Sequence, residues 1–141
     1  DLSETDNKGN LVSMKVFPLV YHGTGRKAEN EMRQTVSEIG RYALMTGKSI
    51  VKEDLSFKKT KAATDTNKNK AGYNRMIHTL DYSRYEDCLQ NMTARKGIDL
   101  IEVNPAYTSR IAKAKYCGTR KIPIHNGAAY VIARRGQGFV A

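Results

Sequence analysis

The hydrophobic pattern changes along the chain between short strand-like runs and helical spacings. We expect a β-hairpin over residues 1–21, because Asn7-Lys8-Gly9-Asn10 supplies the Gly and Asn that tight turns favour. Residues 27–46 predict an amphipathic helix that ends at Gly47. The residues that keep one face of this helix apolar are Met32, Val36, Ile39 and Ala43.

The next segment, residues 48–55, is short and β-branched and ends in two carboxylates, Glu53 and Asp54. This pattern is typical of a largely buried strand. Ligands gather beyond the carboxyl ends of strands in open α/β sheets. Glu53 and Asp54 are therefore site candidates, with ordinary surface carboxylates as the alternative.

The second half of the chain repeats the order of helix and strand. We expect a polar, basic loop over 58–74, a helix over 76–96, a strand over 98–103, irregular structure over 106–124 and a last helix over 126–135. The apolar positions of the helix over 76–96 are Tyr82, Tyr85, Leu89 and Met92. Strands that alternate with helices after a hairpin predict a three-layer α/β or α+β fold. Connections of this length imply that the two later strands run parallel.

Charge adds a class of partner to this picture. The chain has 141 residues, which predicts a single domain over 1–141, and a net charge of +10, which points to nucleic acid. No acidic residue follows Glu102. The basic residues beyond it are Arg110, Lys113, Lys115, Arg120, Lys121, Arg134 and Arg135, and a second cluster comprises Lys58, Lys59, Lys61, Lys68, Lys70 and Arg75. The alternative is a solvated surface kept basic for solubility.

We expect electrostatic contact with the nucleic-acid backbone rather than recognition of base edges. Tyr107 and Tyr130 are candidates for stacking on bases, with packing in the core as the alternative. Arg134 and Arg135 are adjacent in a helix, so they cannot both lie on one face. The candidates for backbone contact are Lys58, Lys59, Lys61, Arg110, Lys113, Lys115, Arg134 and Arg135.

Several classes of protein are excluded by what the sequence lacks. It has no apolar run of membrane-spanning length, no secretory signal, and no basic amphipathic stretch with a bulky aromatic face. Cys88 and Cys117 predict two free thiols, so we expect a cytoplasmic protein. No Gly-rich phosphate loop, serine nucleophile elbow or Cys/His dyad signature occurs.

Four segments, in this order and spacing, carry a family resemblance: residues 5–10, 50–57, 101–109 and 125–136. Over nearly its whole length, the chain resembles the RuvC-like nuclease half of TnpB-type (OrfB) proteins encoded by bacterial insertion sequences. The most specific pieces are Glu53-Asp54-Leu55 and the Asn-Pro-Ala-Tyr-Thr-Ser run over 104–109. The resemblance implies an RNase H-like (RuvC-like) fold, a three-layer mixed sheet with helices. It also implies an RNA-guided DNA nuclease, with DNA and a guide RNA as partners.

The resemblance further implies a metal site. In that family three acidic groups hold two Mg²⁺ or Mn²⁺ ions, which activate the attacking water and stabilise the leaving oxygen. Glu53 matches the second acid, and Asp54 replaces it if the register shifts by one. His125 stands where the third acid usually precedes the last helix, as a ligand or general base, with a capping or packed histidine as the alternative. The implied catalytic and metal-binding residues are thus Glu53 and His125.

The chain also departs from the family pattern. The first acid of the family lies on a strand before the part that aligns with Asp1, so we expect a partial domain that is inactive by itself. Because that strand is central in the RNase H-like sheet, its loss would leave backbone groups unpaired on both neighbours. Either the sheet closes differently, or a partner copy supplies a strand, or the chain is a fragment, and our hypothesis is self-association through an open sheet edge. Many members carry two Cys-x-x-Cys pairs where this chain has only Cys117, so no zinc is expected.

A second function stays open beside the nuclease. A nucleic-acid-binding module without chemistry, or a transposon remnant, needs only the basic clusters and loses affinity steeply with salt. A nuclease needs Glu53 and a divalent metal in addition.

Overall fold

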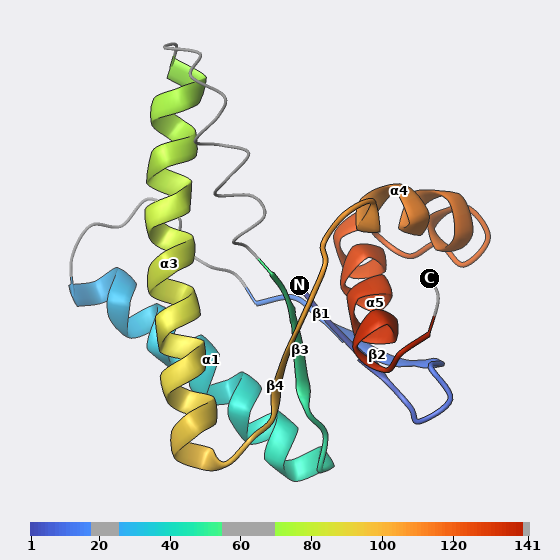
Figure 1. The fold of residues 1–141 in the computed structure, drawn as a ribbon, viewed down its shortest axis with the longest axis horizontal. Helices are drawn as coiled ribbons and strands as arrows, with labels where there is room; N and C mark the ends of the chain where they lie inside the picture. The colour runs from blue at the N-terminus through green and yellow to red at the C-terminus, as the bar shows by residue number, and fades with distance from the viewer. Residues whose placement is uncertain (18–25, 55–69, 140–141) are drawn as a thin grey trace. The chain divides into compact units, whose positions relative to one another are not determined.

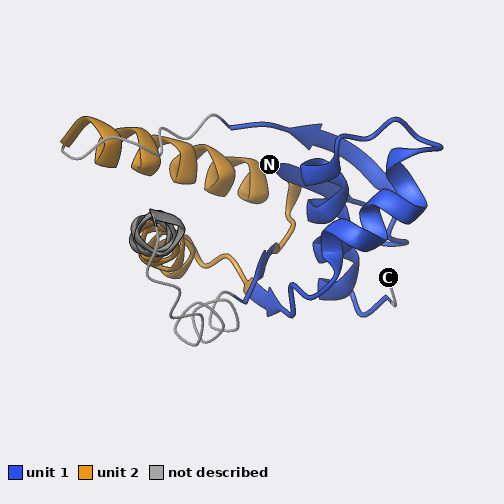
Figure 2. Cartoon of the chain, turned by 90° about the horizontal axis from the view of Figure 1, so that it is seen from above, with its two compact units in different colours: residues 1–17, 51–54, 101–141 blue, residues 18–50, 55–100 orange. Residues whose placement is uncertain are grey.

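The chain is a mixed α/β protein whose internal contacts divide it into two compact units (Figures 1 and 2). The computed structural model describes residues 1–17, 26–54 and 70–139. Unit 1 comprises Asp1–Phe17, Val51–Asp54 and Ile101–Ala141, and unit 2 comprises Pro18–Ile50 and Leu55–Leu100. The predicted single domain thus consists of two units, each with its own buried residues.

Unit 1 begins with the predicted hairpin, which the structure confirms over 2–15, while the end of the prediction over 18–21 lies outside the described residues. Strands β1 (Leu2–Thr5) and β2 (Leu11–Lys15) pair antiparallel. Asp6 fixes the turn, because its carboxylate accepts the backbone N–H groups of Lys8 and Asn10, each at 2.9 Å. The bond from the Asn10 backbone is the main reason why the pKa of Asp6 lies below its ordinary value.

The hairpin turn also contacts the last helix of unit 1. Helix α5 (Ile124–Gly136) packs against β1. The Gly9 carbonyl accepts hydrogen bonds from the Tyr130 hydroxyl and from Arg134 Nη1, each at 2.7 Å. Gly9 has a φ of 78°, and a Cβ on it would lie 2.6 Å from Arg134 Nη1. Glycine is therefore required both by the turn and by the close approach of α5.

Two long helices form most of the described part of unit 2. They are α1 (Arg26–Thr46) and α3 (Lys70–Lys96), and their core consists of Val36, Leu89 and Met92. These three residues belong to the apolar faces that the sequence predicts. The helices approach closely at Gly40, where a Cβ would collide with the Met92 side chain.

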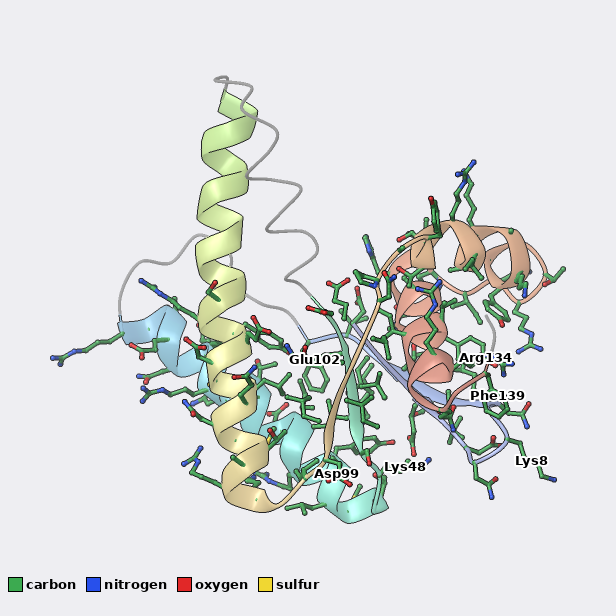
Figure 3. All side chains as sticks on the ribbon, viewed as in Figure 1. Lys8, Lys48, Asp99, Glu102, Arg134 and Phe139 are labelled. Carbon is green, nitrogen blue, oxygen red and sulfur yellow. The ribbon has the colours of Figure 1, made fainter. Side chains whose placement is uncertain are left out.

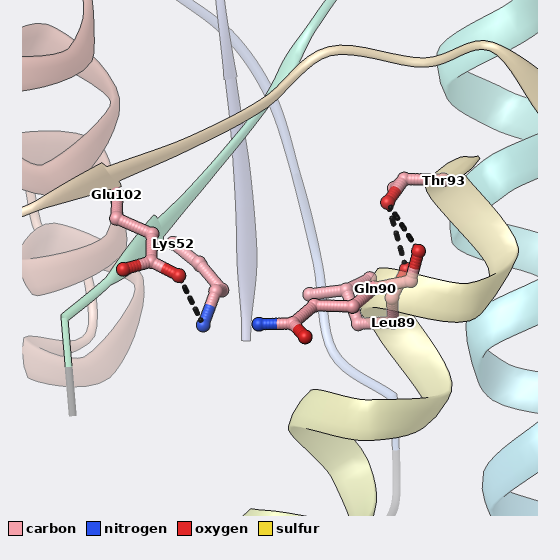
Figure 4. A network of polar contacts seen from close by, with 5 residues as sticks. All are labelled: Lys52, Leu89, Gln90, Thr93 and Glu102. Carbon is pink, nitrogen blue, oxygen red and sulfur yellow. Dashed lines mark hydrogen bonds and ion pairs between the residues drawn. The ribbon is translucent and has the colours of Figure 1, made fainter. Parts of the chain in front are cut away.

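Both helices end in the same way. Gly47 and Gly97 each adopt a φ of 68°, and the next residue donates its N–H back into the helix. These bonds join Lys48 to the Ala43 carbonyl at 3.0 Å and Ile98 to the Thr93 carbonyl at 2.9 Å. This is the Schellman pattern, which satisfies carbonyls that the helix end leaves free. The Thr93 hydroxyl donates to the carbonyls of Leu89 and Gln90 (Figure 4).

Each cap leads directly into a strand, β3 (Ile50–Glu53) after Gly47 and β4 (Leu100–Val103) after Gly97. The Ile50 N–H bonds to the Asp99 carbonyl at 2.9 Å, and the Asp54 N–H bonds to the Val103 carbonyl at 2.7 Å. The partners advance in the same direction, so the predicted parallel pairing is confirmed. Lys52 and Glu102 form an ion pair across the two strands at 3.1 Å (Figure 4).

The structure differs from the sequence-based expectation in two places. Helix α3 already begins at Lys70, so the predicted loop is wrong over 70–74, and its remainder over 58–69 lies outside the described residues. The described strands form two separate two-stranded sheets, β1–β2 and β3–β4, and no single mixed sheet joins them in the part of the chain that the structure describes.

The predicted irregular structure after residue 106 is also wrong over 108–117. This segment forms the short helix α4 (Thr108–Ala112) and the π-helical turn η1 (Lys113–Cys117). Its two buried residues, Thr108 and Ala112, are spaced four apart and mark a narrow inward face. The basic residues Arg110, Lys113 and Lys115 interrupt the remainder, so no regular apolar stripe is visible in the sequence, although Lys and Arg favour helices.

A matched pair of leucines tests the core of unit 2. Leu89 is 2% exposed in this core, whereas Leu44 on α1 is 53% exposed. We expect Leu89→Ala to lower the free energy of unfolding by about 2–5 kcal/mol, because it leaves a cavity. Leu44→Ala should change it by less than about 1 kcal/mol. Urea unfolding of both variants measures the difference, and equal losses would contradict this assignment of the core.

Candidate functional site

The candidate site lies at the carboxyl ends of the parallel strands β3 and β4. Glu53 is the last residue of β3, as the sequence predicts, and Asp54 follows it. Both side chains are half-buried and both have interactions within the protein. The bond between the Asp54 N–H and the Val103 carbonyl holds the two strand ends at one edge. Two carboxylates therefore reach the edge where open α/β sheets bind ligands.

A turn and an arginine complete this edge. The side-chain oxygen of Asn104 accepts the Ala106 N–H at 2.9 Å, and the Asn104 carbonyl accepts Arg135 Nη1 at 2.5 Å. On the same helix, Gly136 packs against Val51 of β3 so closely that a Cβ would overlap the valine methyl groups. The C-terminal end of α5 is thus fixed on β3 and β4. Sequence reasoning did not single out Asn104, although the Asn-Pro pair was visible as a turn signal.

His125 lies in the first turn of α5, and its side chain is exposed. At a helical rise of about 1.5 Å per residue, it is separated from Arg135 by about 15 Å along the helix axis. Among the described residues, no group of three or more His, Cys, Asp or Glu side chains is placed to hold a metal ion. Glu53 and His125 therefore do not by themselves make the oxygen-rich site that Mg²⁺ requires.

The basic candidates fall into four groups. Arg110, Lys113 and Lys115 are exposed on α4 and η1. Arg135 is tied to the Asn104 carbonyl at the strand ends. The remaining described candidate is Arg134, and the three candidates outside the described residues are Lys58, Lys59 and Lys61.

Arg134 is held within unit 1 (Figure 3). Its guanidinium carbon lies 4.8 Å from the ring centre of Phe139 and 5.9 Å from that of Tyr130. Its Nε is buried without a hydrogen-bond partner among the described residues. Arg134 and Arg135 thus face different partners, as their adjacency in a helix requires. Arg134 anchors the hairpin, a role that no local sequence signal indicates.

The two candidate stacking residues, Tyr107 and Tyr130, differ in their exposure to solvent. Tyr130 is 2% exposed, and its ring packs against that of Tyr116 with the centroids 4.7 Å apart. For Tyr130 the packing alternative is therefore correct. Tyr107 precedes α4, and its side chain is 69% exposed.

Both cysteines are free thiols, as predicted. Cys88 packs against the core of unit 2, and burial raises the pKa of its thiol, so it acts as a small apolar side chain. Among the described helices, none has the length and apolar character that crossing a bilayer requires.

No family model, curated protein or solved structure matches this chain. The resemblance to the RuvC-like nucleases therefore stays a prediction from the sequence segments that carry it.

Proposed function

We propose that this chain binds nucleic acid through the basic residues that follow Glu102. The observation that carries the proposal is the exposure of Arg110, Lys113 and Lys115 on α4 and η1, in the same unit as Glu53 and Asp54. No acidic residue occurs from residue 103 onward to neutralise them. A phosphate backbone is the polyanion that such a surface fits best, because each bound Lys or Arg releases condensed counterions.

A pair of arginines on different units tests this binding. We expect Arg110→Ala to weaken binding of DNA of any sequence, and to reduce by about 1 the slope of log affinity against log salt. Arg41→Ala on α1 removes an equally charged, exposed arginine outside this region and should leave the slope unchanged. Fluorescence anisotropy at several salt concentrations measures both. Equal effects of the two substitutions, or binding that is independent of salt, would contradict the proposed surface.

A nuclease is the second candidate, and the position of Glu53 favours it. A carboxylate at the carboxyl end of a strand in a parallel pair supports the RNase H-like arrangement that the resemblance implies. In this proposal the chain is part of an RNA-guided DNA nuclease from an insertion sequence, with Glu53 as a ligand of Mg²⁺ or Mn²⁺. Because the described residues do not assemble a metal site, the remaining ligands would have to come from elsewhere. A binding module or transposon remnant is the alternative.

Glu53→Gln separates the two candidates. The substitution keeps the shape of the side chain and removes its charge, so we expect DNA binding to persist and any Mn²⁺-dependent cutting to disappear. Glu38→Gln, an exposed position on α1, is the matched control and should leave both unchanged. Cutting of a labelled DNA in the presence of Mn²⁺ is the measurement. Cutting that survives Glu53→Gln would exclude the assignment of Glu53, whereas binding without cutting by the unchanged chain is expected both for an incomplete nuclease and for a binding module.

Self-association is proposed for the edge of the hairpin. In the described part of the chain, β2 pairs only with β1, and its exposed large apolar residues are Val12 and Met14, with Val16 directly after the strand. An exposed apolar edge strand is a template for pairing with another chain. We propose that a second copy of the chain pairs along this edge.

A lysine in β2 tests the proposed pairing. Val12 is 55% exposed, and Val12→Lys should shift the chain towards monomer in sedimentation velocity, because a charge on an edge strand opposes pairing. Leu44→Lys changes a residue of similar exposure, 53%, on α1 and should not shift the equilibrium. A monomer for the unchanged chain at high concentration would exclude this interface.

A further inference from the structure

Tyr107 combines an exposed ring with an unfavourable backbone conformation. Its φ of 63° and ψ of 11° place it in the left-handed region, which costs free energy for any residue with a Cβ. A bulky residue in this region persists only where its surroundings impose the conformation, and such residues gather at ligand-binding positions. The side chain is nevertheless 69% exposed, so core packing does not explain its presence.

The neighbours of Tyr107 impose this conformation from both sides. On one side, the Asn104 side chain holds the Ala106 N–H at 2.9 Å. On the other side, Thr108 is buried, and its hydroxyl bonds to the Pro105 carbonyl at 3.2 Å. The Tyr107 carbonyl accepts the Ile111 N–H at 2.9 Å, the bond that starts the helical turn. The backbone is thus fixed, and the ring is directed outward by a rigid support.

The ring of Tyr107 differs from the other tyrosine rings of this region. Tyr116 and Tyr130 pack edge to face, and Arg120 lies 5.6 Å from the ring centre of Tyr116. Among the described residues, no hydrogen-bond or ring partner engages the side chain of Tyr107. An aromatic face is therefore presented to solvent on a segment whose next charged residues, Arg110 and Lys113, are both basic and exposed.

An exposed aromatic ring on a segment that also exposes basic side chains fits one kind of ligand. An unpaired base offers a π-face to the ring, while its phosphates meet the basic side chains. A duplex hides its base faces inside the stack, so it offers only the phosphates. We propose that Tyr107 stacks on an unpaired base and so gives this chain a preference for single-stranded nucleic acid over duplex. This inference rests on the proposed nucleic-acid binding and names the strand state that it favours.

The test compares binding of one labelled oligonucleotide, single-stranded and as a duplex, by the full chain and three variants. We expect Tyr107→Leu to weaken single-strand binding by about 5- to 150-fold, the range for loss of one stacked base, with less than about a twofold change for the duplex. Tyr107→Phe keeps an aromatic face and should bind as the unchanged chain does. Arg110→Ala should weaken both ligands, because it removes a phosphate contact.

Tyr107→Gly separates stacking from folding. Glycine adopts positive φ without strain, so this variant should melt at no lower temperature than the unchanged chain and should still lose single-strand affinity. If the unchanged chain binds neither ligand, the proposed function itself fails. If it binds but the Leu and Gly variants bind single strands equally well, or lose duplex affinity to the same extent, the role of Tyr107 is excluded.

Discussion

Two glycines with positive φ determine where the parallel strands begin. Gly47 and Gly97 end α1 and α3 by the same pattern of hydrogen bonds, and each is followed after two residues by a strand. The strands therefore leave equivalent helix ends, run in the same direction and finish at one edge. A shift of one residue at either glycine would turn alternate side chains to the opposite face. The position of Glu53 at the strand end depends on this constraint.

A single carbonyl has a comparable role in unit 1. The oxygen of Gly9 accepts two hydrogen bonds from α5, one from a neutral hydroxyl and one from a guanidinium. Bonds to charged donors are stronger than neutral ones, so this pair fixes the hairpin firmly against the helix. The other end of α5 is attached to the turn after β4 by Arg135. One helix thus connects the hairpin to the edge that carries the two carboxylates.

Features that depend on local pattern were predictable from the sequence. The turn chemistry around Gly9 gives the hairpin, helical spacing gives α1 and most of α3, and a β-branched run gives β3 with Glu53 at its end. Features that depend on distant contacts were not. Arg134 and Tyr130 both bond to the Gly9 carbonyl, which lies 125 and 121 residues away in the sequence. The sequence had indicated nucleic-acid binding for both side chains, but the structure uses them to hold the hairpin. Helix α4 was not predictable because five residues are too short to show a helical repeat of apolar positions.

The separation in sequence between the hairpin and α5 also affects the order in which the two units fold. All residues of the core around Val36, Leu89 and Met92 have been synthesised by residue 100, long before α5 exists. The hairpin is synthesised before this core, yet its anchors on Tyr130 and Arg134 are made only after it. Contacts of such long range close slowly, because a large loop must be ordered before they form. The residues of the unit 2 core are therefore all present by residue 100, whereas unit 1 cannot close before Tyr130 and Arg134 have been made.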